Sequence, residues 1–129
     1  MQESLITFNL YKAKHNLANI ILWKINRYME LSENIKEESS IKNPTIDHII
    51  PQAKSGQYIH TIGNLTILSK EDNSSKGKKN IENSISKING SSLKINKDLY
   101  RDIVDKTQWT DDDIIERTKK LSNIVIKII

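Results

Sequence analysis

Two neighbouring stretches decide how this chain folds: residues 44–50, PTIDHII, and residues 60–69, HTIGNLTILS. The first is a β-prone run with a proline at each edge, which suits a strand that starts and stops abruptly, so we expect a strand over residues 45–50. The second predicts a strand over residues 62–68. The polar residues between them, with Gly56 at the turn, predict that the two strands form a hairpin.

Apolar residues at helical spacing predict helices on both sides of this hairpin. A long helix is expected over residues 10–31. Its inward face is expected to carry Leu17, Ile21, Ile25 and Tyr28, because these residues repeat with the helical period.

Helices are also expected to follow the hairpin. Isoleucines at helical spacing that end at Gly90 predict a helix over residues 72–88, and a shorter one is expected within 93–104. A last helix should run to about Lys127. Thr110 and Asp113 resemble the capping box that starts a helix, which makes the acidic run 111–113 a helix start rather than a metal cluster.

Length and composition exclude several classes of protein. The chain has 129 residues, the size of one domain, and we expect a single domain made of a helical part (1–40), a core (44–90) and a second helical part (91–129). It has no cysteine, which excludes disulfides, thiolate zinc sites and a cysteine nucleophile. No apolar stretch is long enough to cross a bilayer and no secretion signal is visible, so we expect a cytoplasmic protein without a membrane partner.

The net charge of +4 is concentrated in the middle of the chain. Residues 41–101 carry ten basic and five acidic side chains, and the densest basic cluster is Lys76, Lys78 and Lys79. Such a basic surface attracts polyanions such as nucleic acid. The alternative is a solvated lysine-rich face without a ligand.

Four polar residues in this middle segment suggest chemistry: Asp47, His48, Asn64 and Asn73. A hairpin followed by a helix can bring the end of the first strand close to the start of the helix. Asp47 and Asn73 could then offer two oxygens to one Mg²⁺, which prefers oxygen ligands and fills the rest of its shell with water. His48 could accept a proton from an attacking water near neutral pH. Consecutive strand residues face opposite sides, so both Asp47 and His48 reach one site only if the strand ends there.

These residues, with the surrounding IDHIIP, GNLTILS and NSSKGKK, resemble the HNH nuclease motif, also called the ββα-metal or His-Me finger motif. The closest resemblance is to the HNH domain at the C-terminal end of modification-dependent restriction enzymes of the GmrSD type. A helical segment before the motif and WTDDDIIERTKKL after it occur in that group's usual order, so the resemblance covers nearly the whole chain. It implies an α+β fold, predominantly helical, in which a ββα-metal hairpin-plus-helix core is surrounded by additional α-helices.

The resemblance also implies roles for single residues. Asp47 and Asn73 match the metal ligands, for one divalent ion, Mg²⁺ with Mn²⁺ as the alternative, and no zinc. His48 matches the general base, so the catalytic set is Asp47, His48 and Asn73. Asn64 matches an asparagine that ties the loop in place, and Ile81 stands where phenylalanine is usual.

The implied reaction is hydrolysis of DNA phosphodiester bonds that leaves a 5′-phosphate and a 3′-hydroxyl. Lys79 matches a lysine that follows the motif and contacts phosphate, and Lys76 and Lys78 are weaker candidates for the same role. His60, just before Gly63, is interpreted as a loop histidine, with a place in the cleft as the alternative.

The resemblance implies a bacterial restriction or anti-phage defence system. Such modules usually follow a large N-terminal domain, so a missing N-terminal or upstream NTPase or recognition domain is an expected partner besides DNA. The alternative function is a non-catalytic nucleic-acid-binding module that retains the HNH fold.

Overall fold

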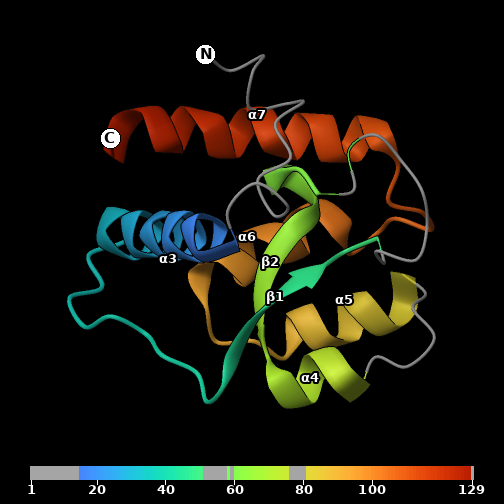
Figure 1. The fold of residues 1–129 in the computed structure, drawn as a ribbon, viewed down its shortest axis with the longest axis horizontal. Helices are drawn as coiled ribbons and strands as arrows, with labels where there is room; N and C mark the ends of the chain where they lie inside the picture. The colour runs from blue at the N-terminus through green and yellow to red at the C-terminus, as the bar shows by residue number, and fades with distance from the viewer. Residues whose placement is uncertain (1–14, 51–57, 59, 76–80, 129) are drawn as a thin grey trace.

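The structure is a computed structural model, and it describes residues 15–50, 58, 60–75 and 81–128 (Figure 1). Helices and strands both occur, which makes the fold α+β. The elements in chain order are α3 (His15–Ser32), β1 (Pro44–His48), the 3₁₀ turn η1 (Ile62–Asn64), β2 (Leu65–Ser69), α4 (Lys70–Ser75), α5 (Ile81–Asn89), α6 (Lys94–Ile103) and α7 (Asp111–Ile128).

The two strands form the antiparallel hairpin that the sequence predicts, in a register that pairs Asp47 with Thr66 and His48 with Leu65. Their bounds differ from the prediction. β1 ends at His48 instead of continuing to residue 50, and residues 62–64 form a 3₁₀ turn instead of the start of β2. β2 runs from η1, which packs on α7, to α4 at the opposite end of the hairpin (Figure 1).

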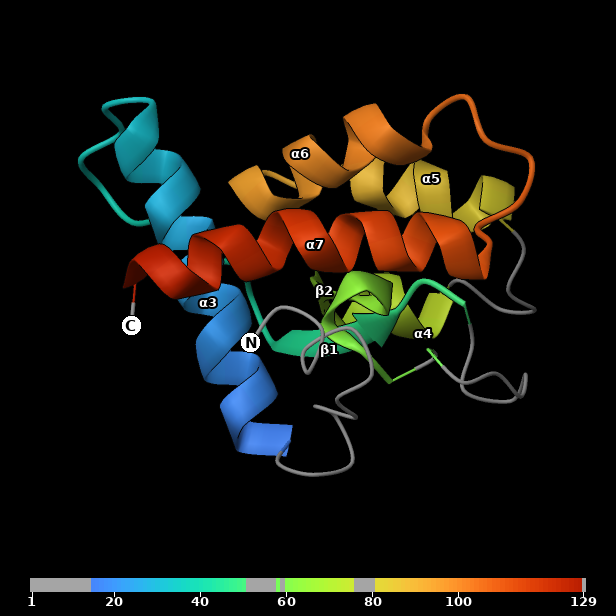
Figure 2. The same ribbon diagram turned by 90° about the horizontal axis from the view of Figure 1, so that it is seen from above.

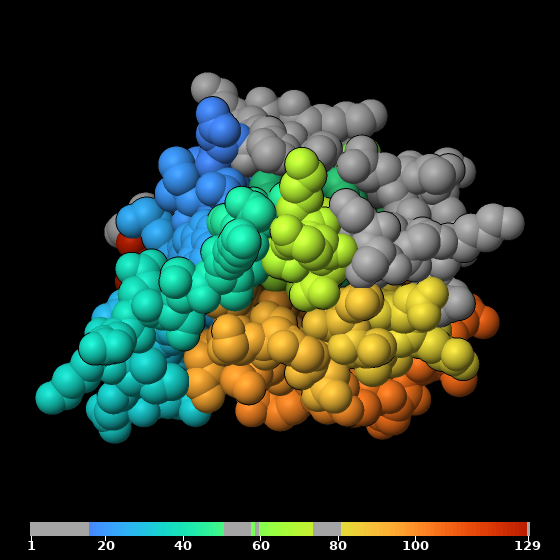
Figure 3. Space-filling view, turned by 90° about the horizontal axis from the view of Figure 1, so that it is seen from below, coloured from blue at the N-terminus to red at the C-terminus, as the bar shows by residue number. Residues whose placement is uncertain are grey.

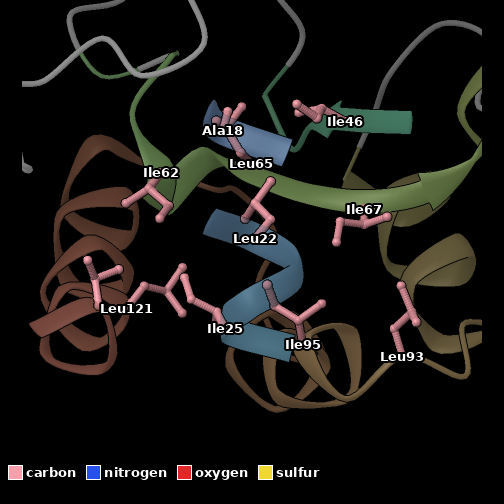
Figure 4. Close-up of a cluster of buried hydrophobic side chains, with 11 residues drawn as sticks. Ala18, Leu22, Ile25, Ile46, Ile62, Leu65, Ile67, Leu93, Ile95 and Leu121 are labelled. Carbon is pink, nitrogen blue, oxygen red and sulfur yellow. The ribbon is translucent and has the colours of Figure 1, made fainter. Parts of the chain in front are cut away.

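The main hydrophobic core lies between β2 and the helices α3, α6 and α7 (Figure 4). Four of the five β2 residues are buried, so both faces of this strand are covered. α7 crosses over α3 and lies above the hairpin when the molecule is viewed from above (Figure 2). The most buried side chains of this core are Ala18, Leu22, Ile25, Ile62, Leu65, Ile67, Leu93, Ile95 and Leu121.

The expected inward face of the first helix was right for Ile25 and wrong for Leu17. Ala18, Leu22 and Ile25 are fully buried, whereas Leu17 is 38% exposed. The helix carries apolar side chains on more than one side, so its spacing fits two adjacent stripes equally well. Contacts with α6 and α7 select the stripe that faces the core.

Two helices occupy the region in which one helix over residues 72–88 was expected. α4 contacts both strands of the hairpin, and α5 contacts α6. The residues between them lie outside the described part of the chain. α4 is visible on the lower face of the molecule, beside the segment that leads into β1 (Figure 3).

The capping box at the start of α7 is confirmed. The backbone N–H of Thr110 donates to the Asp113 carboxylate at 2.8 Å, and the backbone N–H of Asp113 donates to the Thr110 hydroxyl oxygen at 3.3 Å. These bonds satisfy helix-end groups that would otherwise lack partners. The start of α7 is thereby fixed at Asp111, beside the buried Trp109.

Candidate functional site

The candidate site begins at the end of β1, where Asp47 and His48 are only 1% and 5% exposed. Their side chains leave the strand on opposite faces. β1 ends at His48, and the use of both residues in one site stays a prediction.

Asn73 reaches this strand from α4. Its side-chain Nδ2 donates to the hydroxyl oxygen of Thr45 at 3.0 Å and to the carbonyl oxygen of Ile46 at 3.3 Å. Thr45 and Asp47 are two residues apart, so they share one face of β1. Asn73 therefore packs against the strand face that carries Asp47.

Asn64 determines where β1 stops. The backbone N–H of Ile50 donates to Asn64 Oδ1 at 2.9 Å, and Asn64 Nδ2 donates to the carbonyl oxygen of Ile50 at 3.1 Å. The backbone N–H of Ile49 donates to the carbonyl oxygen of Asn64 at 2.9 Å. At residue 50 a side-chain amide thus takes the place of the partner strand's backbone, which explains why the ladder does not continue to that residue.

Gly63 places Asn64 by packing directly on α7. Its backbone N–H donates to the Thr118 hydroxyl oxygen at 3.0 Å. A Cβ atom at this position would lie 2.1 Å from the carbonyl oxygen of Ile114 and 2.2 Å from Thr118 Oγ1. Only glycine allows so close an approach, and this contact explains why residues 62–64 form a turn instead of a strand.

Arg117, one residue earlier on α7, holds the same turn and was missed in the sequence. Its Nη1 donates to the carbonyl oxygens of Gly63 at 3.1 Å and Leu65 at 2.7 Å, on either side of Asn64. Burial lowers the pKa of Arg117 to about 10, against the opposing effect of Asp98 and Asp102, so the guanidinium stays charged at neutral pH. A charged residue on a helix face that otherwise carries no charge is a signal that could have identified it.

His60 contacts His48, whereas the sequence was interpreted as giving it a place in a loop, with the cleft as the alternative. Its Nδ1 lies 3.0 Å from His48 Nε2, within hydrogen-bond distance. The two rings are nearly perpendicular, at 89°, with centroids 5.0 Å apart. His60 is therefore a direct neighbour of His48 and not an isolated loop histidine, and the spacing His-x-x-Gly-Asn was the available signal.

Asp47 and Asn73 carry the types of oxygen donor that a hard divalent cation takes. Asp47 carries a buried carboxylate, and Asn73 holds β1 through its Nδ2. Within the described ranges, no group of three or more histidine, cysteine, aspartate or glutamate side chains could hold a metal. Carboxylate and amide oxygens are ligands that Mg²⁺ and Mn²⁺ accept.

The lysine candidates Lys76, Lys78 and Lys79 lie outside the described residues. A cavity of about 330 Å³ exists elsewhere, between α6 and α7. It contains none of the candidate residues and is lined by equal numbers of acidic and basic side chains, so it is not a basic groove. Its lining residues are Asp102, Lys106, Trp109, Asp113, Glu116, Arg117 and Lys120.

None of the helices in the described part of the chain is both long and apolar enough to span a membrane. Comparison with curated proteins gave no match, and comparison with solved structures gave none either. Comparison with protein families gave a match to the GmrSD restriction endonucleases, C-terminal domain, over residues 1–124. That match spans all the elements described above except the last turn of α7. The chain therefore belongs to the family of GmrSD restriction endonuclease C-terminal domains.

Proposed function

We propose that this chain is a metal-dependent DNA endonuclease of the HNH type, the nuclease module of a bacterial restriction or anti-phage defence system. One observation carries the proposal: the Asn73 amide is anchored on β1, the strand that carries the buried Asp47 and ends at His48. Three motif residues that span 27 positions thus belong to one hairpin-plus-helix unit. Membership of a restriction endonuclease family supports the same reaction class.

The proposed roles follow from the chemistry of each group. Asp47 and Asn73 would hold one Mg²⁺ or Mn²⁺ through a carboxylate and an amide oxygen. When bound, this ion would stabilise the negative charge that develops on the phosphate. His48 takes the proton from the water that attacks phosphorus. The bond from phosphorus to the 3′ oxygen then breaks, and this oxygen takes a proton from solvent water, which leaves a 3′-hydroxyl and a 5′-phosphate.

Two further groups assist. The first supports the site without touching the reacting atoms, and the second would contact the substrate at its edge. Asn64 ties residue 50 to the start of β2 and so sets the end of the strand that carries His48. Lys79, with weaker contributions from Lys76 and Lys78, would contact the DNA phosphates. Each neutralised phosphate releases counterions, so this contact would make binding dependent on salt.

The test is cleavage of supercoiled plasmid DNA with Mg²⁺ or Mn²⁺, by the wild-type chain, His48→Ala and His15→Ala. His15 is the third histidine and lies at the first residue of α3, which makes it a matched control. We expect the wild type and His15→Ala to cut and His48→Ala to lose cutting by several orders of magnitude. DNA binding without cutting under either metal would instead identify a non-catalytic binding module.

Metal binding is tested separately by calorimetry with Mn²⁺. Asp47→Ala and Asn73→Ala should each weaken binding by roughly tenfold or more, because each removes an oxygen ligand. His48→Ala should bind Mn²⁺ as the wild type does. Unchanged affinity in both ligand variants would refute the metal assignment even if the chain cuts DNA.

A further inference from the structure

The contact between His48 and His60 joins two segments that are separated along the chain. His48 is the last residue of β1, and His60 lies 12 positions later, just before η1. The nitrogens in contact are Nε2 of His48 and Nδ1 of His60, 3.0 Å apart. The contact therefore occupies one of the two nitrogens of the proposed general base.

The segment that presents His60 is fixed independently of β1. The backbone N–H and the hydroxyl group of Thr61 both donate to the carbonyl oxygen of Tyr58, at 3.1 and 2.7 Å. Thr61 is buried, and η1 follows it directly and is held on α7 through Gly63. His60 thus stands on a turn supported by α7, and its ring approaches His48 from outside the strand that carries His48.

A hydrogen bond between two neutral imidazoles decides which nitrogen of each ring carries the proton. A neutral ring has one N–H donor and one lone pair. If His48 Nε2 donates to His60 Nδ1, the lone pair of His48 is on Nδ1 and can accept a proton. If His60 donates instead, His48 Nδ1 carries a proton and neither nitrogen of His48 can act as a base.

We propose that His60 is a positioning residue for His48: its Nδ1 accepts the hydrogen bond from His48 Nε2–H. This bond fixes the orientation of the His48 ring and leaves Nδ1 of His48 as the atom that takes the proton from water. The arrangement follows the general pattern in which a base is held in one tautomer by a third group. The inference rests on the proposed nuclease function.

The first experiment compares His60→Ala, His60→Asn and His60→Gln in plasmid cleavage with Mn²⁺. The carbonyl oxygen of asparagine sits one bond from Cγ, as Nδ1 of histidine does, whereas the glutamine oxygen lies one bond further out. We expect His60→Ala and His60→Gln to lower kcat by about ten- to a hundredfold, the usual effect of removing an orienting partner. His60→Asn should recover most of the wild-type kcat, and KM for DNA should stay unchanged in all three.

Two outcomes of this experiment would overturn the inference. One is a wild-type kcat in His60→Ala and His60→Gln. The other is a loss of Mn²⁺ affinity in the His60 variants that matches the loss of kcat, because His60 would then be a metal ligand. Calorimetry on the same variants separates the second outcome from the expected one.

The second experiment measures the tautomer of His48 in the folded wild-type chain by ¹⁵N NMR, without substrate and without metal. We expect a protonated Nε2 and an unprotonated Nδ1 on His48. The reverse assignment would overturn the inference whatever the variants do. Because this measurement needs no turnover, it tests the histidine pair even if the wild-type chain fails to cut DNA. Failure to cut DNA would count against the proposed function alone.

Discussion

At the scale of a single residue, the Asn64 carboxamide has a task that its closest isostere cannot perform. It accepts a hydrogen bond from the N–H of Ile50 and donates one to the carbonyl oxygen of the same residue. A carboxylate can only accept, so Asn64→Asp would place an anion against a carbonyl oxygen in a buried position. We expect Asn64→Asp to lower the free energy of unfolding by about 1–3 kcal/mol.

Denaturant unfolding at neutral pH measures this change, with Asn19→Asp on the exposed side of α3 as the control. The control should stay within about 0.5 kcal/mol of the wild type. Equal stability of Asn64→Asp and Asn19→Asp would mean that the amide does not hold residue 50.

At the scale of elements, η1 and α7 are in contact through their backbones. Gly63→Ala would push a methyl group into the carbonyl oxygen of Ile114, which belongs to a helix and cannot move aside freely. We expect a loss of about 1–3 kcal/mol or more of unfolding free energy. The fractional loss of the proposed nuclease activity should exceed the fraction of chain that is unfolded, because η1 also carries Asn64 and adjoins His60.

Gly90→Ala is the matched control for this prediction. The nearest atoms to a Cβ at that position are carbonyl oxygens 3.7 Å away, an ordinary contact distance. Thermal unfolding of the two variants should show a clear decrease for Gly63→Ala and little change, or a gain of about 0.4–1 kcal/mol, for Gly90→Ala. Similar unfolding temperatures for the two variants would contradict the close packing.

The same elements show what could be predicted from the sequence and what could not. Local rules found the hairpin, the short helix α6 and the capped start of α7, because strand propensity, helical spacing and capping depend on residues near one another in the chain. They failed for residues 49–50 and 62–64, whose conformation depends on Asn64 and on α7. The contact between Gly63 and Thr118 joins residues 55 positions apart, and no local pattern contains it.

The residues of the candidate site also fall into two groups, those that motif spacing suggests and those that depend on tertiary contacts. Asp47, His48 and Asn73 were identified by motif spacing, and the structure brings Asn73 to the strand that carries the other two. Arg117 and the pairing of His60 with His48 depend on tertiary contacts, so the sequence could suggest these residues only as isolated polar positions.

At the scale of the whole molecule, buried and paired carboxylates make stability depend on pH. Burial alone would raise the pKa of Glu30, Asp98 and Asp113, but hydrogen bonds and nearby cations outweigh it and hold each pKa below its ordinary value. A group whose pKa is lowered in the folded chain stabilises the fold at pH values above its ordinary pKa. This stabilisation is lost as the pH falls through the pKa of the folded state. The partners are Ser39 and Arg27 for Glu30, Lys120 and Arg101 for Asp98, and Thr110 and Lys106 for Asp113.

We therefore expect the free energy of unfolding to be level near neutral pH and to fall once the pH drops below the ordinary values of 4.5 for Glu30 and 3.8 for Asp98 and Asp113. Urea titrations at a series of pH values measure this profile. Asp113→Asn should show a shallower decline on the acid side, because one of the three groups no longer titrates. Stability that rises toward acid would contradict the assignment.

The support that α7 gives to η1 has a consequence for how the protein folds while it is being synthesised. A ribosome releases Asp47, His48 and Asn73 well before it releases Arg117 and Thr118, which follow the hairpin along the chain. The nascent chain therefore carries every motif side chain while it still lacks the helix on which the turn between the strands rests. We expect the turn that carries Asn64 to become ordered only after α7 has been synthesised.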